Sequence, residues 1–487
     1  MIAAGKTRRP LVIASVMAAM FMVAIEATIV STAMPQIAAQ LGGLDLYAWV
    51  FSSFLLAQTA TTVVFGKLSD TYGRKPVLLA GIAVFLVGSA LCGFAWSLPS
   101  LIAFRLVQGI GAGAVQPVAM TVVGDLYTAE ERGRVQGFLA GVWAVSALVG
   151  PLAGGLIVQH LAWAWVFWIN LPVGALAFAG FTNFLHEAGA RERRPVDVLG
   201  AILFALLVAA LMVALSASGD PRTALPALTG LALAAGLFVL QQRRSAEPMI
   251  AAGLWGRRPI AAANGASLLA GMALVGLTTF LPIYVQGVMG RSALVAGFAL
   301  TMSVVGWPLG ATLSARSFGR FGLRPVMRAG GALMPVGALA FVWLTPEASP
   351  ALAGAGSFVM GFGMGLVSTA AIVLVQEIVA WRERGSATAS NIFSRNLGST
   401  LGAAALGAVL GHALARPDGT AVTSEQLRRL IEAPGGASAP DAATRALLHH
   451  GLHLTFWAVL ALSLLVTLLA ALVPPVALGR GRDDVAE

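Results

Sequence analysis

Uncharged stretches long enough to cross a lipid bilayer recur along the whole chain. Three of the longest, 135–186, 348–376 and 446–479, contain no Asp, Glu, Lys or Arg. A helix needs about 20 apolar residues to cross a hydrocarbon core about 30 Å thick. Only 11% of the residues are charged, against about 25% in soluble domains, so a water-soluble fold is excluded. The sequence therefore predicts an all-α polytopic membrane protein.

Breaks at glycine, proline and charge clusters divide the chain into fourteen predicted transmembrane helices. They are 11–34, 46–66, 77–96, 99–126, 135–158, 163–185, 198–217, 224–241, 260–286, 293–315, 326–345, 350–376, 387–411 and 453–475. With a cytoplasmic N-terminus, 23 of the 31 Lys and Arg residues lie on the cytoplasmic side. Because cytoplasmic loops are enriched in basic residues, we expect both termini in the cytoplasm and a location in the inner or plasma membrane. This asymmetry accounts for the net charge of +10, so no nucleic-acid partner is expected.

Two loop motifs occur twice at nearly the same spacing. Gly73 has a counterpart in Gly322, 249 positions later, and Asp125 with Glu131-Arg132-Gly133 reappears as Glu377 with Glu383-Arg384-Gly385, 252 positions later. Such internal repeats are typical of transporters, in which the substrate site lies between the two halves. The predicted domains are an N-terminal six-helix bundle at 1–185, an inserted helix pair with its loops at 186–258, a C-terminal six-helix bundle at 259–475 and a cytoplasmic tail at 476–487.

Four segments resemble signatures of the major facilitator superfamily. Residues 66–76 (GKLSDTYGRKP) resemble its cytoplasmic loop signature, and 101–113 (LIAFRLVQGIGAG) resemble its fourth-helix signature. Residues 141–155 (GVWAVSALVGPLAGG) are similar to the fifth-helix signature of antiporters, and 25–35 (IEATIVSTAMP) to the first-helix signature of the fourteen-helix drug:proton antiporter branch (EmrB/QacA type). The resemblance spans residues 11–475. It implies a major facilitator fold, with two six-helix bundles and two inserted helices.

The same resemblance implies a proton-coupled antiporter that exports amphipathic or hydrophobic small molecules, as in multidrug or antibiotic efflux. The sequence has no Walker motif of the form G-x-x-x-x-G-K-[ST], so we expect a proton gradient to drive transport, with neither ATP nor a cofactor. Export of a lipid or an endogenous secondary metabolite is the alternative on the same fold. A membrane sensor or a membrane enzyme is a further alternative, although no nucleophile-plus-base set supports an enzyme.

Glu26 and Arg105 are the predicted proton-coupling residues. Glu26 lies eight residues, or about 12 Å, before Met34, and Arg105 lies about 9 Å into the fourth span from the same side. A charged carboxylate is unstable in the membrane interior, so Glu26 should be protonated or paired with a cation. We expect the two side chains to interact and Glu26 protonation to be the coupling step. The alternative is a static ion pair. The related antiporters usually have Asp at the position of Glu26.

Polar residues on several spans predict a substrate cavity. Arg105, Gln108 and Gln116 share one face of the fourth span, and Asn391 and Arg395 share one face of the thirteenth. A polar face is unfavourable against lipid, so it should line the interior. The alternative is that these residues only satisfy contacts between helices, and the charge of the substrate stays open. The predicted cavity residues are Gln108, Gln116, Asn264, Gln286, Trp307, Asn391 and Arg395.

Charged and glycine residues at cytoplasmic helix ends predict a gate. We expect ion pairs among them to hold the two halves together and to break when the halves rock. The alternative is solvated loop charge, worth under about 1 kcal/mol per pair. The predicted gate residues are Gly66, Asp70, Gly73, Arg74, Asp125, Arg132, Glu377 and Arg384.

The fifth span predicts close helix packing. Small residues let a neighbouring helix approach, and a proline favours a bend because it removes one backbone hydrogen bond. The residues concerned are Gly141, Gly150, Pro151, Gly154 and Gly155.

The remaining expectations concern partners and the outer surface. We expect a monomer that binds protons, a small-molecule substrate and the lipid bilayer. The outer segment 412–452 is predicted to lie on the membrane surface or to contact an accessory protein. No metal site is expected, because His449 and His453 are four residues apart but no Cys or acid cluster accompanies them.

Overall fold

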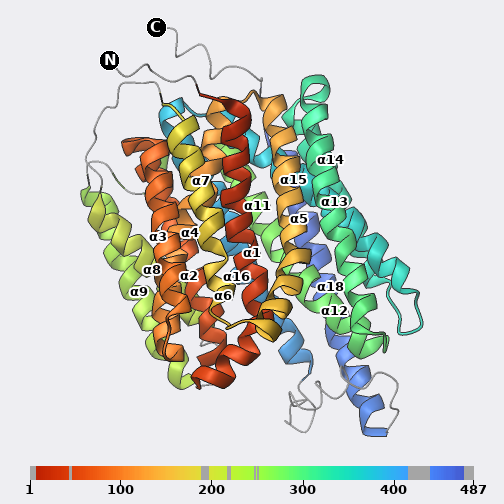
Figure 1. Ribbon diagram of the computed structural model, residues 1–487. Coiled ribbons are helices and arrows are strands. Elements are labelled where there is room, and N and C mark those ends of the chain that lie inside the picture. Colours follow the sequence, from red (N-terminus) through yellow and green to blue (C-terminus); the bar gives the residue numbers. More distant parts are fainter. Residues whose placement is uncertain are drawn as a thin grey trace, which may run out of the picture. The chain divides into compact units, whose positions relative to one another are not determined.

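The computed structural model describes residues 7–42, 46–187, 197–216, 221–245, 248, 250, 252–414 and 439–476. Throughout these residues the regular secondary structure is helical (Figure 1). Thirteen of the described helices are long and apolar enough to cross a membrane. The one remaining predicted span, the thirteenth (387–411), corresponds to α16 (Arg384–Ala413), which is 30 residues long but more polar, since it contains Asn391, Arg395 and Asn396. The prediction of an all-helical polytopic fold is confirmed.

The chain forms two compact units. The first comprises the described residues of Met1–Arg257 together with Val375–Phe393, and the second those of Arg258–Leu374 and Ser394–Leu478. The segment Val375–Phe393, which follows the twelfth predicted span, therefore packs with the first half of the sequence. The four-part division of the chain at 185, 258 and 475 describes the sequence repeat and stays a prediction.

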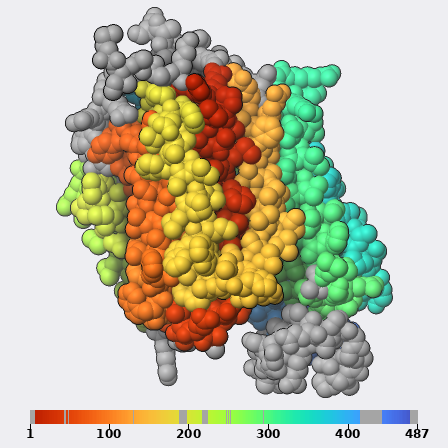
Figure 2. All heavy atoms as spheres, viewed as in Figure 1, coloured from red at the N-terminus to blue at the C-terminus, as the bar shows by residue number. Residues whose placement is uncertain are grey.

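The first unit is built around α4, which packs against both α2 and α3. On one face of this unit, α1 lies between α7 and α5, seen in Figure 2 as red between yellow and orange. The inserted pair α8 and α9 pack on each other, and α8 also contacts α2. The helices of Met1–Arg257 are α1 (Arg9–Leu41), α2 (Tyr47–Tyr72), α3 (Arg74–Gly93), α4 (Leu98–Leu126), α5 (Ala129–His160), α6 (Trp165–Trp168), α7 (Asn170–Phe184), α8 (Val198–Ser216), α9 (Pro221–Arg244) and α10 (Ala252–Trp255).

Several helices extend past the apolar runs because local capping continues them. α5 begins at Ala129, where Thr128 and Glu131 form a reciprocal capping box. α2 continues to Tyr72 and ends at Gly73, whose φ of +97° is a conformation that glycine adopts without strain. As a consequence, Asp70 and Arg132 lie on helices.

In the second unit, α18 packs against α14 and α11. The ninth predicted span is one long helical stretch, Arg258–Val288, that contains two π-helical turns. The elements are α11 (Arg258–Val275), η2 (Gly276–Phe280), α12 (Leu281–Ile283), η3 (Tyr284–Val288), α13 (Ala293–Phe321), α14 (Leu323–Val342), α15 (Pro350–Glu377), η4 (Trp381–Glu383), α16 and α18 (Ala439–Leu472), with Val375–Phe393 belonging to the first unit.

The histidine pair of the second unit takes part in hydrogen bonds at the end of η3. Tyr284 Oη donates to the carbonyl of Leu344 at 2.8 Å and lies 3.0 Å from His449 Nδ1. His453 Nε2 donates to the same carbonyl at 2.6 Å. Both histidines are thus engaged with protein groups. Most of the predicted outer segment, 415–438, lies outside the described residues, as do 477–487 of the tail.

Candidate functional site

Glu26 lies at the centre of a polar network that is buried inside the first unit. Its side chain on α1 is 0% exposed, and that of Arg105 on α4 is 2% exposed. The Arg105 guanidinium forms an ion pair with Glu26 Oε1. It also donates from Nε to the Val50 carbonyl at 3.1 Å, and its Cζ lies 4.3 Å from the ring centroid of Phe54. Both charges are removed from water, and each stabilises the other.

Asn170 on α7 belongs to this network, and the sequence analysis missed it. Its Nδ2 donates to Glu26 Oε2 and, at 3.1 Å, to Ser89 Oγ on α3. Its Oδ1 is buried and has no hydrogen-bond partner in the described part of the chain. The available signal was an amide side chain in the middle of the otherwise apolar run 161–181.

Gln108 completes the network. Its Oε1 accepts from Arg105 Nη1 at 2.8 Å, and its Nε2 donates to Ser89 Oγ at 3.1 Å. Donors thus reach both oxygens of Glu26, which suits an ionised carboxylate. A proton on either oxygen converts an acceptor into a donor and must displace one of these contacts. The arrangement is therefore able to respond to proton uptake.

The other predicted cavity residues are distributed over both units. Gln116, on α4 of the first unit, is 6% exposed, and Asn391, on α16 of the same unit, is 5% exposed. In the second unit, Asn264 is buried on α11, Gln286 Nε2 donates to the Pro282 carbonyl at 3.4 Å, and Trp307 is half-buried on α13. Arg395 also belongs to the second unit. The role of these residues in a substrate cavity stays a prediction.

The glycines of the fifth span differ in what they contact. A Cβ at Gly150 would lie 2.8 Å from Thr28 Cβ, and one at Gly154 would lie 2.9 Å from the Ile29 carbonyl oxygen, both on α1. A Cβ at Gly141 or Gly155 would meet nothing within 4 Å, and Pro151, inside α5, is exposed. Close approach of α5 to α1, the helix that carries Glu26, therefore depends on Gly150 and Gly154.

This difference provides a matched pair of variants. We expect Gly154→Val to lower the free energy of unfolding by about 1–3 kcal/mol, the usual effect of overpacking, and to reduce transport, because α1 is displaced. Gly155→Val, one residue further along α5, should leave both nearly unchanged. Thermal unfolding of the purified variants and a transport assay measure the two effects. Equal losses of stability and transport in both variants would show that these losses do not come from close packing at Gly154.

A second network of charged residues lies at the helix ends of the first unit. Asp70, near the end of α2, accepts from the Gly385 N–H at 2.8 Å and from the Ser386 N–H and Oγ–H at 2.7 Å each. These are donors of the first turn of α16, where a negative charge is favourable. The Arg74 Nη1 lies 3.1 Å from Asp70 Oδ1. Asp70 thus fixes the start of α16 to α2.

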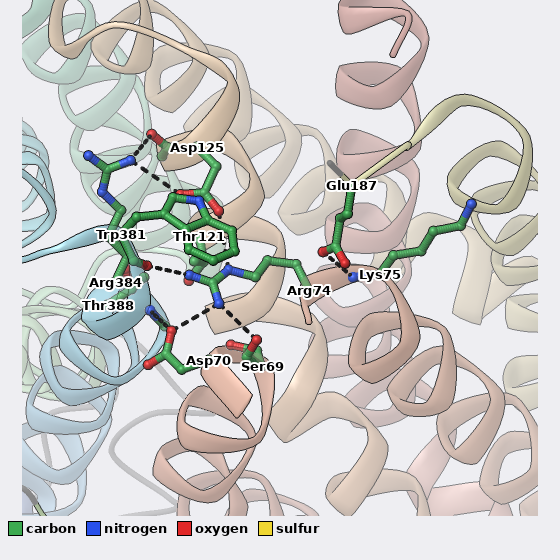
Figure 3. A network of polar contacts seen from close by, with 12 residues as sticks. Ser69, Asp70, Arg74, Lys75, Thr121, Asp125, Glu187, Trp381, Arg384 and Thr388 are labelled. Carbon is green, nitrogen blue, oxygen red and sulfur yellow. Dashed lines mark hydrogen bonds and ion pairs between the residues drawn. The ribbon is translucent and has the colours of Figure 1, made fainter. Parts of the chain in front are cut away.

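Two ion pairs of this network join residues from different copies of the loop motif (Figure 3 shows the surroundings of Asp125). Asp125 binds Arg74 at 3.1 Å and Arg384 at 3.3 Å, while Arg132 binds Glu377 at 2.7 Å. Asp125 of the first copy therefore pairs with Arg384 of the second copy, and Glu377 of the second copy pairs with Arg132 of the first. The side chains of Arg74, Arg132 and Arg384 are at most 8% exposed, so these pairs are not solvated loop charges.

Three further residues support this network, and the sequence analysis did not single them out. Trp381 accepts from Arg74 Nη2 through its carbonyl at 2.7 Å, and its ring lies 4.4 Å from Arg74 Cζ. Gln376 donates to the Met120 carbonyl, and Ser386 binds Asp70. A Cβ at Gly66 would lie 2.8 Å from the Gly385 carbonyl oxygen. We call Gln376, Trp381 and Ser386, together with the eight predicted gate residues, the cytoplasmic network.

Because Asp70 caps the start of α16, removing its side chain should destabilise the first turn of that helix. Loss of a capping side chain costs about 0.5–2 kcal/mol, so Asp70→Ala should speed amide exchange in 384–390 about tenfold. Hydrogen exchange measured by mass spectrometry reports this. Asp197→Ala is the control, because Asp197 accepts from the Gly200 N–H near the start of α8 and has no contact with the cytoplasmic network. Unchanged exchange in 384–390 of the Asp70 variant would contradict the assignment.

The fold and the site together define the class of the protein. Helices of membrane-spanning length, a duplicated chain and a buried acid–arginine pair are features of a polytopic membrane transporter of small molecules. The chain belongs to the Major Facilitator Superfamily, whose family model matches residues 16–403.

Known proteins of this family resemble the chain over most of its length. The multidrug transporter protein MdtP of Bacillus subtilis is 34% identical over 412 residues, which cover 83% of this chain and 76% of the relative. Multidrug resistance protein 3 of the same organism is 34% identical over 403 residues, 82% of this chain and 79% of the relative. The crystal structure of the human organic anion transporter MFSD10 shares the fold with a TM-score of 0.66 at 16% identity, covering 96% of this chain and 100% of that one.

Proposed function

We propose that the protein is a proton-coupled exporter that exchanges amphipathic or hydrophobic small molecules for protons by alternating access. The observation that carries this proposal is the fully buried carboxylate of Glu26, bound by Arg105 and Asn170. Ionisable residues inside membrane spans mark ion pathways and proton relays. A purely structural role explains the pair poorly, because apolar residues of similar volume often stabilise a protein as well as a buried ion pair does.

Protonation of Glu26 changes what Arg105 binds. When the carboxylate takes up a proton, the ion pair is lost, whereas the guanidinium stays charged. Arg105 still has the Val50 carbonyl, Gln108 Oε1 and the face of Phe54 as partners. The two protonation states of Glu26 therefore favour different arrangements of α1, α4 and α7. A proton gradient is then sufficient to drive the conformational exchange, and neither ATP nor a cofactor enters the proposal.

The cytoplasmic network acts as the gate in this proposal. It binds Val375–Phe393, from the second half of the sequence, to the ends of α2, α4 and α5. Because its charges are buried and paired, opening on the cytoplasmic side requires Asp70, Asp125 and Glu377 to release their partners together. This cooperativity makes the gate either closed or open.

The orientation, substrates and partners follow the sequence expectations. The excess of Lys and Arg in alternate loops supports a cell-membrane protein with both termini in the cytoplasm. The names of the two Bacillus relatives support drug-like substrates. We expect the protein to act as a monomer, without nucleic acid. The outer segment 412–452 is proposed to contact the membrane surface or an accessory protein.

Substrate-driven proton movement tests the proposal. The full chain is reconstituted in liposomes with an acidic interior and an internal pH dye, and a panel of cationic, neutral and anionic amphipathic drugs is added outside. We expect some members to accelerate proton loss through the protein, above the rate in protein-free liposomes. A panel of lipids and secondary metabolites tests the alternative cargo. Absence of coupled proton movement with every compound would refute the proposed function.

A further inference from the structure

Arg395 is a charged side chain in the second unit without a counter-charge. It lies eleven residues after Arg384, the first residue of α16, or about 16 Å along the helix and close to the midplane of a bilayer. Its guanidinium forms no hydrogen bond or ion pair with any residue that the structure describes. Arg105, an arginine inside a span of the first unit, has Glu26 as its partner.

The membrane-spanning helices of the second unit contain no carboxylate that could pair with Arg395. Residues 258–346, 348–374, 394–413 and 442–472 include no Asp or Glu. Glu347 lies in the connection between α14 and α15. A guanidinium cannot lose its proton under these conditions, and an uncompensated charge is strongly unfavourable in a protein interior. A bound anion would therefore supply the counter-charge that the described spans of the second unit do not contain.

The backbone that carries Arg395 is enclosed and held against α11. No residue from Arg384 to Gly402 is exposed, so Arg395 is not a lipid-facing side chain. Ser399 Oγ lies 3.4 Å from the Gly271 carbonyl oxygen, and a Cβ at Gly402 would lie 2.6 Å from Met272 Cα. Such close helix packing fixes the backbone that carries the arginine before any ligand binds, which reduces the entropy lost on binding.

We propose that Arg395 binds an anionic group of the transported substrate, so that the protein prefers amphipathic molecules carrying a carboxylate or a similar oxyanion. The inference rests on the proposed function, since it names the substrate class of that transporter. The planar guanidinium offers two parallel N–H donors that match the two oxygens of a carboxylate. The apolar walls supplied by the surrounding helices would accommodate the remainder of the molecule.

Binding of a matched pair of probes tests this proposal without requiring transport. The probes are 1-pyrenebutyrate and its neutral amide, 1-pyrenebutyramide, titrated into the purified full chain in lipid nanodiscs, with empty nanodiscs as the blank. We expect the wild-type protein to bind the carboxylate about tenfold to a hundredfold more tightly than the amide, the range for one hydrogen bond to a charged group. Arg395→Gln should abolish this preference, and Arg395→Lys should retain part of it.

The controls separate a charge effect at Arg395 from other causes. Arg328→Gln removes one arginine from α14 of the same unit, where Arg328 donates to the Ala471 carbonyl at 2.6 Å, and should keep the preference. Glu26→Gln should also keep it while losing proton exchange, so the two proposals fail independently. Equal binding of the two probes to the wild type, no binding of either, or an equal loss of both in Arg395→Gln would overturn the inference. The comparison of the two probes on the wild-type protein tests the inference even if a variant does not fold.

Discussion

Glu26→Gln reduces substrate-driven proton exchange to the rate of protein-free liposomes, while the protein stays folded. Glutamine has the shape of the protonated acid but cannot release a proton. Its carbonyl oxygen accepts from Arg105, and its amide N–H donates to Asn170 Oδ1 once the Asn170 amide turns over, because Asn170 Nδ2 now faces this position. Residue 26 therefore keeps its contacts with Arg105 and Asn170, and only the titration is lost.

The comparison variant for this experiment is Glu383→Gln. Glu383 is 39% exposed and lies 3.4 Å from Arg257, so the substitution changes the same functional group outside the buried network. Exchange in this variant should remain close to that of the wild type. Wild-type rates of exchange in Glu26→Gln would show that Glu26 and Arg105 form a static ion pair and would remove the basis of the coupling mechanism.

Arg105→Met gives the largest expected loss of stability. Breaking a buried ion pair by removing one partner costs about 3–5 kcal/mol, because the other charge is left uncompensated. The loss should be greatest at high pH and smaller at low pH, since an acidic medium protonates the orphaned Glu26. Unfolding of the purified protein as a function of pH measures this dependence.

The double variant Glu26→Gln/Arg105→Met distinguishes stability from coupling. Without the carboxylate, no charge remains in the buried network, so most of the lost stability should return. Proton exchange should stay absent. If the two substitutions instead add in their effects on the free energy of unfolding, the two side chains do not interact energetically, and the observed contact has no energetic significance.

The residues that the sequence singled out in the first unit were the charged ones. One acid in the first span and one arginine in the fourth are conspicuous, because charges inside a membrane are rare and costly. Asn170 and Ser89 were missed, since uncharged polar residues are tolerated at many positions of membrane helices. Their importance becomes visible only when α3 and α7 bring them to Glu26.

The sequence also did not predict which charged residues of the cytoplasmic network pair with each other. The repeat placed Asp125 near Arg132 and Glu377 near Arg384 along the chain, and it predicted a charged cluster. Proximity in sequence did not predict the partners, which are exchanged between the two copies. Pairing depends on which helix ends meet, and that is determined by packing between segments about 250 residues apart.

Membrane insertion, helix positions and the two charges of the buried pair are consequences of the sequence alone, because each span is selected by its own transfer free energy between water and lipid. The contacts of Glu26, the exchanged ion pairs and the isolation of Arg395 were decided by tertiary structure. They depend on distances between side chains of different helices, and no property of a single segment contains that information.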